Sequence, residues 1–305
     1  MPDFPTPHLE KLKATLVNEK LPVGDRPRLE AAIERYHQWI ASLNSMTGAT
    51  EQIVEQMVHS LDEYKTYVDV DLIFDSEDDF LYRQKGQLKL DNSIIEEFLP
   101  RLVRPAIIPE LAELNLIAGP QSCFSAVFFN SSLDAPQAGG GLSIRAKDQD
   151  FAVSKPLYLR ASHSPDFSDA IERTTCIAYV ATECKTNLDK TMFQEACATA
   201  HDTKVAVSGA KYYLLCEWLD MTPLSTAPTD IDEIIILRKA RRLSANLRKD
   251  FNTAAKRKLR RADYLKHLNA HPLQPEMFKR FLTHIRQLLN NEAPIEKNVL
   301  ELGYF

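Results

Sequence analysis

An acidic and a basic side chain end an apolar run near the middle of the chain. The run "CIAYVATECK", residues 176–185, stops at Glu183 and Lys185. Residues two apart in a β-strand share a face, so these two side chains would point to one side and Cys184 to the other. Hydrolysis of a phosphodiester with a hard metal ion uses such a pair, because a carboxylate binds Mg²⁺ and a lysine orients the attacking water. We take Glu183 as a candidate metal ligand and Lys185 as a candidate catalytic residue.

A second acidic ligand is expected, because one carboxylate rarely holds Mg²⁺. Asp150 stands at the head of "DFAVSKPLYLR", an apolar strand that would pair beside the Glu183 strand. Asp166 follows a proline in the loop "SHSPDFSD", which also contains Asp169. Strand ends hold side chains more rigidly than loops do, and metal ligands need that rigidity. We therefore prefer Asp150, keep Asp166 as the alternative acid, and rank Asp169 third.

The surrounding pattern predicts the elements that position these residues. The first 118 residues show apolar positions at helical spacing, in "PHLEKLKATLVNEK", "RPRLEAAIERYHQWIASL" and "ATEQIVEQMVHSLDEYKTY". Strand-like segments follow from residue 122, then a helix from about residue 188 to 201 that Asn187 could cap, and then the strand "AKYYLLCEWL". This order predicts an α/β fold with a mixed sheet flanked by helices and an N-terminal helical region.

Composition excludes several classes of protein. The chain has 305 residues, 44% hydrophobic and 26% charged, and it lacks the long uncharged run of a membrane helix. We expect no membrane partner and a location in the cytoplasm, since the N-terminus has no signal-peptide pattern. The five cysteines form neither a CxxC pair nor a close Cys/His set, so they are expected to be buried free thiols.

Two groups of residues could contact a polyanion. Arg145, Lys147 and Gln149 share a face of the strand just before Asp150, and such side chains can reach base edges. The segment 238–266 contains twelve Lys and Arg residues against two Asp. Its first members would suit phosphates, which position a protein on nucleic acid without reading sequence: Arg238, Lys239, Arg241 and Arg242. Solvated faces are the alternative for both groups.

The order "DFAV" followed by "ATECKTNLDK" resembles the PD-(D/E)xK nuclease superfamily with its proline missing. The longer phrase "ECKTNLDKTM", together with "TDIDEIIILRKARR", is similar to type II restriction endonucleases of the group that cuts sites built around CTNAG. That group includes two-subunit enzymes with asymmetric sites. The similarity covers about residues 142–242. It implies Asp150 and Glu183 as metal ligands and Lys185 as the catalytic lysine, and leaves the first acid least certain.

These observations predict a Mg²⁺-dependent, site-specific endonuclease that hydrolyses double-stranded DNA. Residues 1–118 would be a helical region for dimerisation or DNA contacts, and residues 119–305 a nuclease core with a basic C-terminal helical segment. Cutting both strands needs two active sites, so we expect a homodimer or pairing with a similar subunit, and a cognate DNA methyltransferase as functional companion. The alternatives are a repair or mobile-element nuclease with the same core, and a non-catalytic DNA-binding protein.

Overall fold

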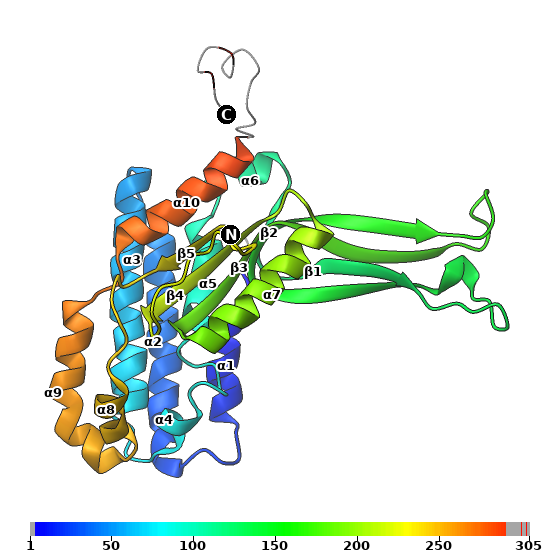
Figure 1. Cartoon of the computed structure of the whole chain (residues 1–305). Helices are drawn as coiled ribbons and strands as arrows, with labels where there is room; N and C mark the ends of the chain where they lie inside the picture. The colour runs from blue at the N-terminus through cyan, green and yellow to red at the C-terminus, as the bar shows by residue number, and fades with distance from the viewer. Residues whose placement is uncertain (1–3, 291–299, 301–302, 304–305) are drawn as a thin grey trace.

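The computed structural model describes residues 4–290, 300 and 303 of the chain. Its N-terminal part is helical, as the apolar spacing predicted: α1 (Pro7–Leu16), α2 (Arg26–Ser45), α3 (Thr50–Tyr67), α4 (Phe80–Gln84), α5 (Ser93–Leu102) and α6 (Glu110–Glu113). A π-helical segment, Val68–Phe74, continues α3 directly. Figure 1 shows α1, α2 and α3 standing side by side next to the sheet. No helix of the described residues is long and apolar enough to cross a membrane.

Five strands form one mixed sheet in the order β1-β2-β3-β4-β5. They are β1 (Ile117–Phe129), β2 (Leu142–Ala161), β3 (Ile171–Leu188), β4 (Lys211–Leu219) and β5 (Glu233–Ile236). The pairs β1–β2 and β2–β3 are antiparallel, whereas β3–β4 and β4–β5 are parallel. The predicted fold class, a mixed sheet with flanking helices and an N-terminal helical region, is confirmed.

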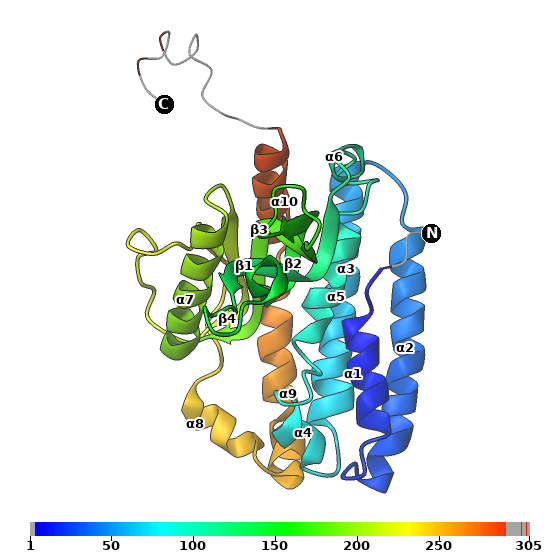
Figure 2. The same ribbon diagram turned by 90° about the vertical axis from the view of Figure 1, so that its right-hand side faces the viewer.

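The two faces of the sheet bury different sets of side chains. On β4, Tyr213 and Leu215 pack with the N-terminal helices and α10 (Pro275–Leu289) in the larger core. Tyr212 and Leu214 point the other way and pack with α7 (Lys190–Ala206) in a smaller core. This alternation is the period-two pattern of a strand buried on both faces. Figure 2 shows α7 on one side of the sheet and α1, α2, α3 and α5 on the other.

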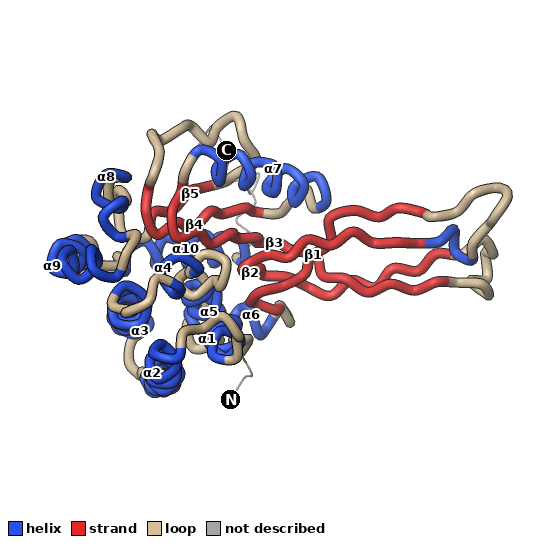
Figure 3. The backbone as a smooth tube through the Cα atoms, turned by 90° about the horizontal axis from the view of Figure 1, so that it is seen from below, coloured by secondary structure: helices blue, strands red, loops and turns tan. Residues whose placement is uncertain are grey.

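The first three strands continue beyond the covered part of the sheet as a projecting arm, visible in Figures 1 and 3. We call it the β-arm and define it as residues 122–148, which form the β1–β2 hairpin, and residues 154–179, which form the β2–β3 hairpin. Irregular pairing interrupts β2 on both sides, at Gly119/Gln121 on β1 and at Val153/Ser154, and such bulges bend a strand. Both hairpins therefore point in the same direction.

The tips of the two hairpins touch. The N–H of Gly140 in the first tip donates a hydrogen bond of 3.1 Å to Nε2 of His163 in the second. Gly139 has φ of +54°, and a Cβ at this position would lie 2.5 Å from the carbonyl oxygen of Ala161. Only glycine allows this approach, so the sequence "GGG" fixes the contact between the two hairpins.

Helix α7 begins two residues later than predicted, at Lys190. Its N-cap is Asp189, whose side chain accepts a hydrogen bond of 2.9 Å from the N–H of Met192. Asn187 was expected to cap a helix starting at about Leu188, and this was wrong because β3 extends to Leu188. Asn187 still belongs to the strand and is nearly buried there.

The basic segment beyond β5 forms two helices, α8 (Ala245–Arg248) and α9 (Ala254–Ala270). Arg257 on α9 is 1% exposed, and its guanidinium donates to the carbonyl oxygens of Phe74, Ser76 and Asp78. It thus satisfies acceptors at the end of the π-helical segment. Part of the positive charge in this segment therefore serves the fold and is unavailable to a ligand.

Candidate active site

Strand pairing brings the first candidate acid to the Glu183 strand. Phe151 on β2 pairs with Thr182 on β3 in antiparallel register, which sets Asp150 beside Glu183. Oδ2 of Asp150 accepts a hydrogen bond of 2.9 Å from the backbone N–H of Cys184. The carboxylate is therefore held by the backbone of the strand that carries the other candidate residues.

Glu183 and Lys185 lie on the face of β3 that α7 covers. The Nζ of Lys185 is 2.5 Å from Oε1 of Glu183, and both side chains are about four-fifths buried, with 23% and 20% of their surface exposed. The other oxygen, Oε2 of Glu183, accepts a hydrogen bond of 2.9 Å from the hydroxyl of Tyr212 on β4. Each carboxylate oxygen of Glu183 thus has a defined partner, and the side chain keeps a fifth of its surface exposed.

The electrostatics of the site follow from this partial burial. Burial raises the pKa of Asp150 above its usual range, and the nearby Glu183 carboxylate adds to the increase, while the Cys184 N–H opposes it. Burial alone would lower the pKa of Lys185, but the hydrogen bond and charge of Glu183 outweigh it, so the pKa of Lys185 is raised. Lys185 is therefore an ammonium at neutral pH, and its charge partly offsets that of the two acids.

The alternative acids lie at the far end of the β-arm. Asp166 is in the loop between β2 and β3, where its Oδ1 accepts a hydrogen bond of 3.1 Å from the N–H of Ser168. Asp169 accepts hydrogen bonds from the hydroxyl of Ser162 and the N–H of Ser164 in the same loop. Neither aspartate is brought to Glu183, because β2 leaves the site at Asp150 and reaches this loop only after Ala161.

A third carboxylate near the site was not among the predicted residues. Glu96 on α5 is 6% exposed, and its Oε1 has no hydrogen-bond partner among the described residues. Burial raises its pKa to about 7, and the charge of Asp150 contributes to the increase. The sequence offered one sign of this residue, because "SIIEEFL" places two acids in an otherwise apolar helix. Helical spacing alone could not show which strand that helix would cover.

The donors present suit a magnesium ion. Among the described residues, no group of three or more His, Cys, Asp and Glu side chains forms a ready metal cluster. Mg²⁺ is commonly held by one or two carboxylates, with waters and substrate phosphate oxygens completing its shell. Asp150 and Glu183 supply two such carboxylates from neighbouring strands, and the unpartnered oxygen of Glu96 is a further hard donor nearby. The residues therefore fit the ion that the sequence predicted.

The three candidate base-reading residues on β2 have different environments. Arg145 is exposed on the β-arm. Lys147 donates a hydrogen bond of 2.7 Å to Oγ1 of Thr199 on α7, and is half-buried. Gln149 is 6% exposed, which is at odds with a contact to a base edge. Their shared face is not exposed throughout, because β2 runs from the free arm at Arg145, past α7 at Lys147, to the covered part of the sheet at Gln149.

The predicted phosphate contacts also separate in the structure. Lys239 and Arg241 are exposed, with Nζ of Lys239 3.2 Å from Oε1 of Glu276. Arg242 is partly exposed and donates 3.0 Å to Oδ2 of Asp220. Arg238 is 1% exposed, and this burial contradicts its predicted role at a phosphate. The prediction failed because the periodicity of a basic run does not show which member turns inward.

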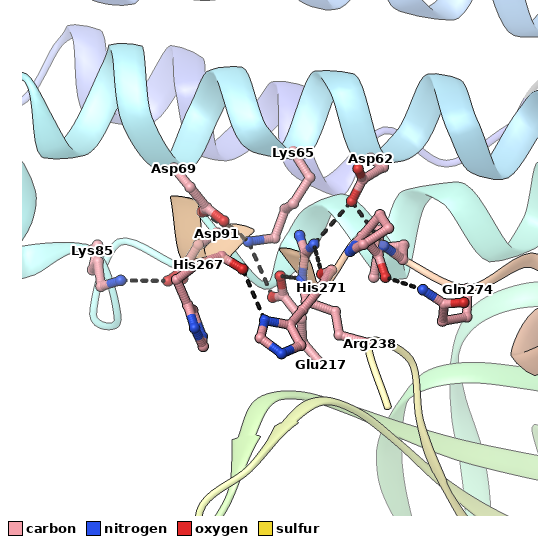
Figure 4. A network of polar contacts seen from close by, with 12 residues as sticks. Asp62, Lys65, Asp69, Lys85, Asp91, Glu217, Arg238, His267, His271 and Gln274 are labelled. Carbon is pink, nitrogen blue, oxygen red and sulfur yellow. Dashed lines mark hydrogen bonds and ion pairs between the residues drawn. The ribbon is translucent and has the colours of Figure 1, made fainter. Parts of the chain in front are cut away.

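Arg238 belongs to an internal network that joins the N-terminal helices to the sheet, shown in Figure 4. Its Nε donates 2.7 Å to Oε1 of Glu217 on β4, and its Nη1 donates 2.9 Å to Oδ1 of Asp62 on α3. Lys65 on α3 lies 3.1 Å from the other oxygen of Glu217 and bonds Asp69. Alternating charges thus compensate one another inside the protein, as buried charges require.

The arrangement defines the class of protein. The chain resembles a structure described as "native BbvCI A2B2 tetramer at low resolution", with a TM-score of 0.64 and 19% identity over 96% of this chain and 100% of that chain. The fold is thus that of a solved restriction enzyme. Residues 87–305 match the Bpu10I restriction endonuclease family, and the chain belongs to that family. No curated protein matches the sequence. The resemblance to type II restriction endonucleases is thereby confirmed.

Proposed function

We propose that this restriction endonuclease cuts duplex DNA at a specific site with Mg²⁺, and that Asp150 and Glu183 hold the metal while Lys185 acts in catalysis. The observation that carries the proposal is the meeting of these residues at one place on β2 and β3. Asp150 is bound to the Cys184 N–H, and Glu183 lies 2.5 Å from the Lys185 ammonium. Membership of a restriction endonuclease family indicates that the substrate is DNA.

Each of these side chains has a separate role in hydrolysis. Asp150 and Glu183 would hold Mg²⁺, which would polarise a phosphoryl oxygen and lower the pKa of a water. Lys185 is protonated, so it donates hydrogen bonds to the attacking water or to a phosphate oxygen and stabilises the negative charge of the transition state. Tyr212 holds Glu183 in place through its hydroxyl.

DNA contacts are assigned to the predicted basic residues that are at least partly exposed. We propose that Arg145 and Lys147 approach the duplex near the cut and that Lys239, Arg241 and Arg242 bind phosphates. The buried Arg238 and Gln149 are left out of this set. Residues 1–118 would then act as a helical region beside a nuclease core of residues 119–305, whose last residues lie partly outside the described part of the chain.

The partners and location follow the same reasoning. We propose an oligomer, because one chain supplies one active site and both strands must be cut; the BbvCI structure is described as an A2B2 tetramer. A DNA methyltransferase that modifies the same sequence would protect the host DNA, and both enzymes would work in the cytoplasm. The expected target is a site built around CTNAG.

A digest of unmodified phage DNA tests the proposal. Discrete fragments that form with Mg²⁺ and disappear with a chelator are expected, and sequencing their ends gives the recognition site and the cut positions. Nicking that follows DNA structure instead of sequence would favour a repair or mobile-element nuclease. Binding without cleavage with every divalent metal tested would indicate a non-catalytic DNA-binding protein.

A further inference from the structure

The β-arm collects the exposed aromatic side chains of the protein. Among the described residues, the exposed Phe and Tyr side chains all lie on the arm: Phe128, Phe129, Tyr158, Phe167 and Tyr179. Their exposed fractions run from 37% for Tyr179 to 76% for Tyr158. Val127 and Leu133 of the first hairpin are exposed as well. Aromatic side chains are enriched at protein interfaces, and clustered exposed apolar groups mark interaction sites.

The outer strand of the arm has no charged residue to protect it as a sheet edge, and its two irregularities of pairing, at Gly119/Gln121 and Phe124/Ala126, both lie before Val127. β1 is the first strand of the sheet order, and its sequence "IAGPQSCFSAVFF" contains no charged residue. Beyond Pro120, near its start, the strand also has no proline. Natural proteins normally place charges, proline or bulges on such edges to prevent pairing with another chain. An uncharged edge that ends in exposed Val127, Phe128 and Phe129 is suited to a partner protein.

Charge is distributed unevenly along the arm. The two tips, residues 130–141 and 162–170, contain Asp134, Asp166 and Asp169 and no Lys or Arg. The stem between the tips and the candidate active site contains five basic residues and two acidic ones: Arg145, Lys147, Lys155, Arg160 and Arg173, with Asp148 and Glu172. Within the described part of the chain, the three tip aspartates have no ion pair with Lys or Arg. The arm therefore has an acidic end and a basic stem.

We propose that the β-arm is the interface with a second copy of this chain, and that the two arms pack antiparallel about a two-fold axis. In that arrangement the acidic tip of each arm lies on the basic residues of the other arm's second hairpin, Lys155, Arg160 and Arg173, which leaves Arg145 and Lys147 for DNA. The uncharged β1 edges and exposed aromatic rings meet in the middle. A two-fold contact is self-complementary, which the opposite charges of tip and stem allow. Burying five half-exposed aromatic side chains removes roughly 500 Å² per copy, which reaches the lower range for a specific interface.

Duplex DNA is the less suitable occupant of this surface. The acidic tips would be repelled by phosphates, and DNA-binding surfaces carry a strong excess of positive charge. The interface deepens the proposed function, because pairing two chains would supply the two active sites that a double-strand cut requires. Its test uses no DNA and no metal, so its outcome does not depend on whether the enzyme cuts.

The first experiment measures the mass of the full chain in solution by analytical ultracentrifugation. The wild type is expected to be a dimer, and Phe128→Asp with Phe129→Asp to raise the dimer dissociation constant at least 100-fold. Leu259→Asp on α9, where the side chain is 83% exposed, is the matched control and should leave the dimer unchanged. Thermal unfolding of each variant establishes that it is folded.

The second experiment reverses the charges. Asp166→Lys with Asp169→Lys at the tip should weaken the dimer, and so should Lys155→Glu with Arg173→Glu on the stem. Mixing the two variants should restore a dimer, because each tip then meets a stem of opposite charge. A wild-type monomer at up to about 100 μM would overturn the proposal, as would unaffected dimers in the arm variants. A dimer that forms only with a different subunit, or arm variants that lose DNA affinity at unchanged mass, would also overturn it.

Discussion

The backbone N–H of Cys184 donates a hydrogen bond of 2.9 Å to Oδ2 of Asp150. This contact crosses from β3 to β2 and locks the Asp150 carboxylate against the strand that carries Glu183 and Lys185. The group is thereby oriented before any metal binds, which reduces the conformational entropy lost on binding. Asp166, by contrast, is fixed only within its own loop at the tip of the β-arm.

Asp150→Asn is expected to abolish Mg²⁺-dependent cleavage, whereas Asp166→Asn should retain most of it. Asp150→Asn removes the charge of a proposed metal ligand. Asp166→Asn alters an exposed residue in the loop that follows the end of β2. Cleavage rates of both variants on phage DNA, with Mg²⁺ varied, provide the measurement. If the Asp166 variant were inactive and the Asp150 variant active, the first acid would have to be reassigned.

Glu183→Ala and Lys185→Ala are expected to abolish cleavage while leaving DNA binding largely intact. Both residues act more strongly on the transition state than on the bound substrate, so their loss lowers the rate more than the affinity. Single-turnover cleavage and gel-shift affinity should be measured on the same preparations. Cleavage within about tenfold of the wild type, which is roughly 1.4 kcal/mol, would contradict the assignment.

Glu96→Gln tests whether this carboxylate, which the sequence did not predict, takes part in binding the metal. Its unpartnered oxygen near Asp150 suggests that it binds the metal or one of the metal's waters. The variant should therefore need a higher Mg²⁺ concentration for half-maximal cleavage, by roughly tenfold or about 1.4 kcal/mol. The exposed Glu113→Gln variant is the control. An unchanged Mg²⁺ dependence would limit Glu96 to a structural role.

Substitution of exposed basic residues should change DNA binding, whereas substitution of the buried Arg238 should change stability. Lys239→Ala with Arg241→Ala should weaken specific and non-specific DNA binding alike and reduce the salt slope by about one or two units. Lys20→Ala, an exposed change on the helical region, is the control. Arg238→Met should instead lower the free energy of unfolding by roughly 3–5 kcal/mol, because it removes the arginine partner of the Glu217 and Asp62 carboxylates. A salt slope equal to that of the wild type would show that the exposed face is merely solvated.

Stability should fall in mild acid because of His8. Burial lowers the pKa of this histidine to about 3, and the charge of Lys65 adds to the decrease. Its ring is held neutral between the side chains of Tyr64 and Ser93. The unfolded chain binds a proton at His8 below about pH 6.5 and the folded one does not, so the free energy of unfolding falls by about 1.4 kcal/mol per pH unit as pH decreases from 6.5 toward 3.

Urea unfolding at pH 7.5 and pH 5.5 measures this contribution. The wild type should lose more stability than His8→Gln over this interval. His37→Gln, an exposed change on α2, serves as the control. Equal losses in wild type and His8→Gln would mean that His8 is protonated in the folded protein or that other groups dominate.

Local pattern was enough for most of the secondary structure and for part of the site. Apolar spacing identified α1, α2 and α3, and the short apolar run "KYYLLCEWL" identified β4, because such patterns are properties of the local chain. The pairing of Glu183 with Lys185 followed from their separation by two residues on one strand. The preference for Asp150 over Asp166 also came from the sequence, although only the cleavage experiments test it.

Tertiary structure decided what depends on distant segments. No local pattern showed that Arg238 would turn inward to Glu217 and Asp62, since burial of a charge depends on partners contributed by β4 and α3. Glu96 approaches the site only because α5 packs on the sheet. The two hairpins of the β-arm point in one direction because bulges bend β2, and their tips then meet at Gly140 and His163. Residue spacing therefore determined the elements and the chemistry of single strands, while long-range packing determined which charges serve the fold and which remain exposed.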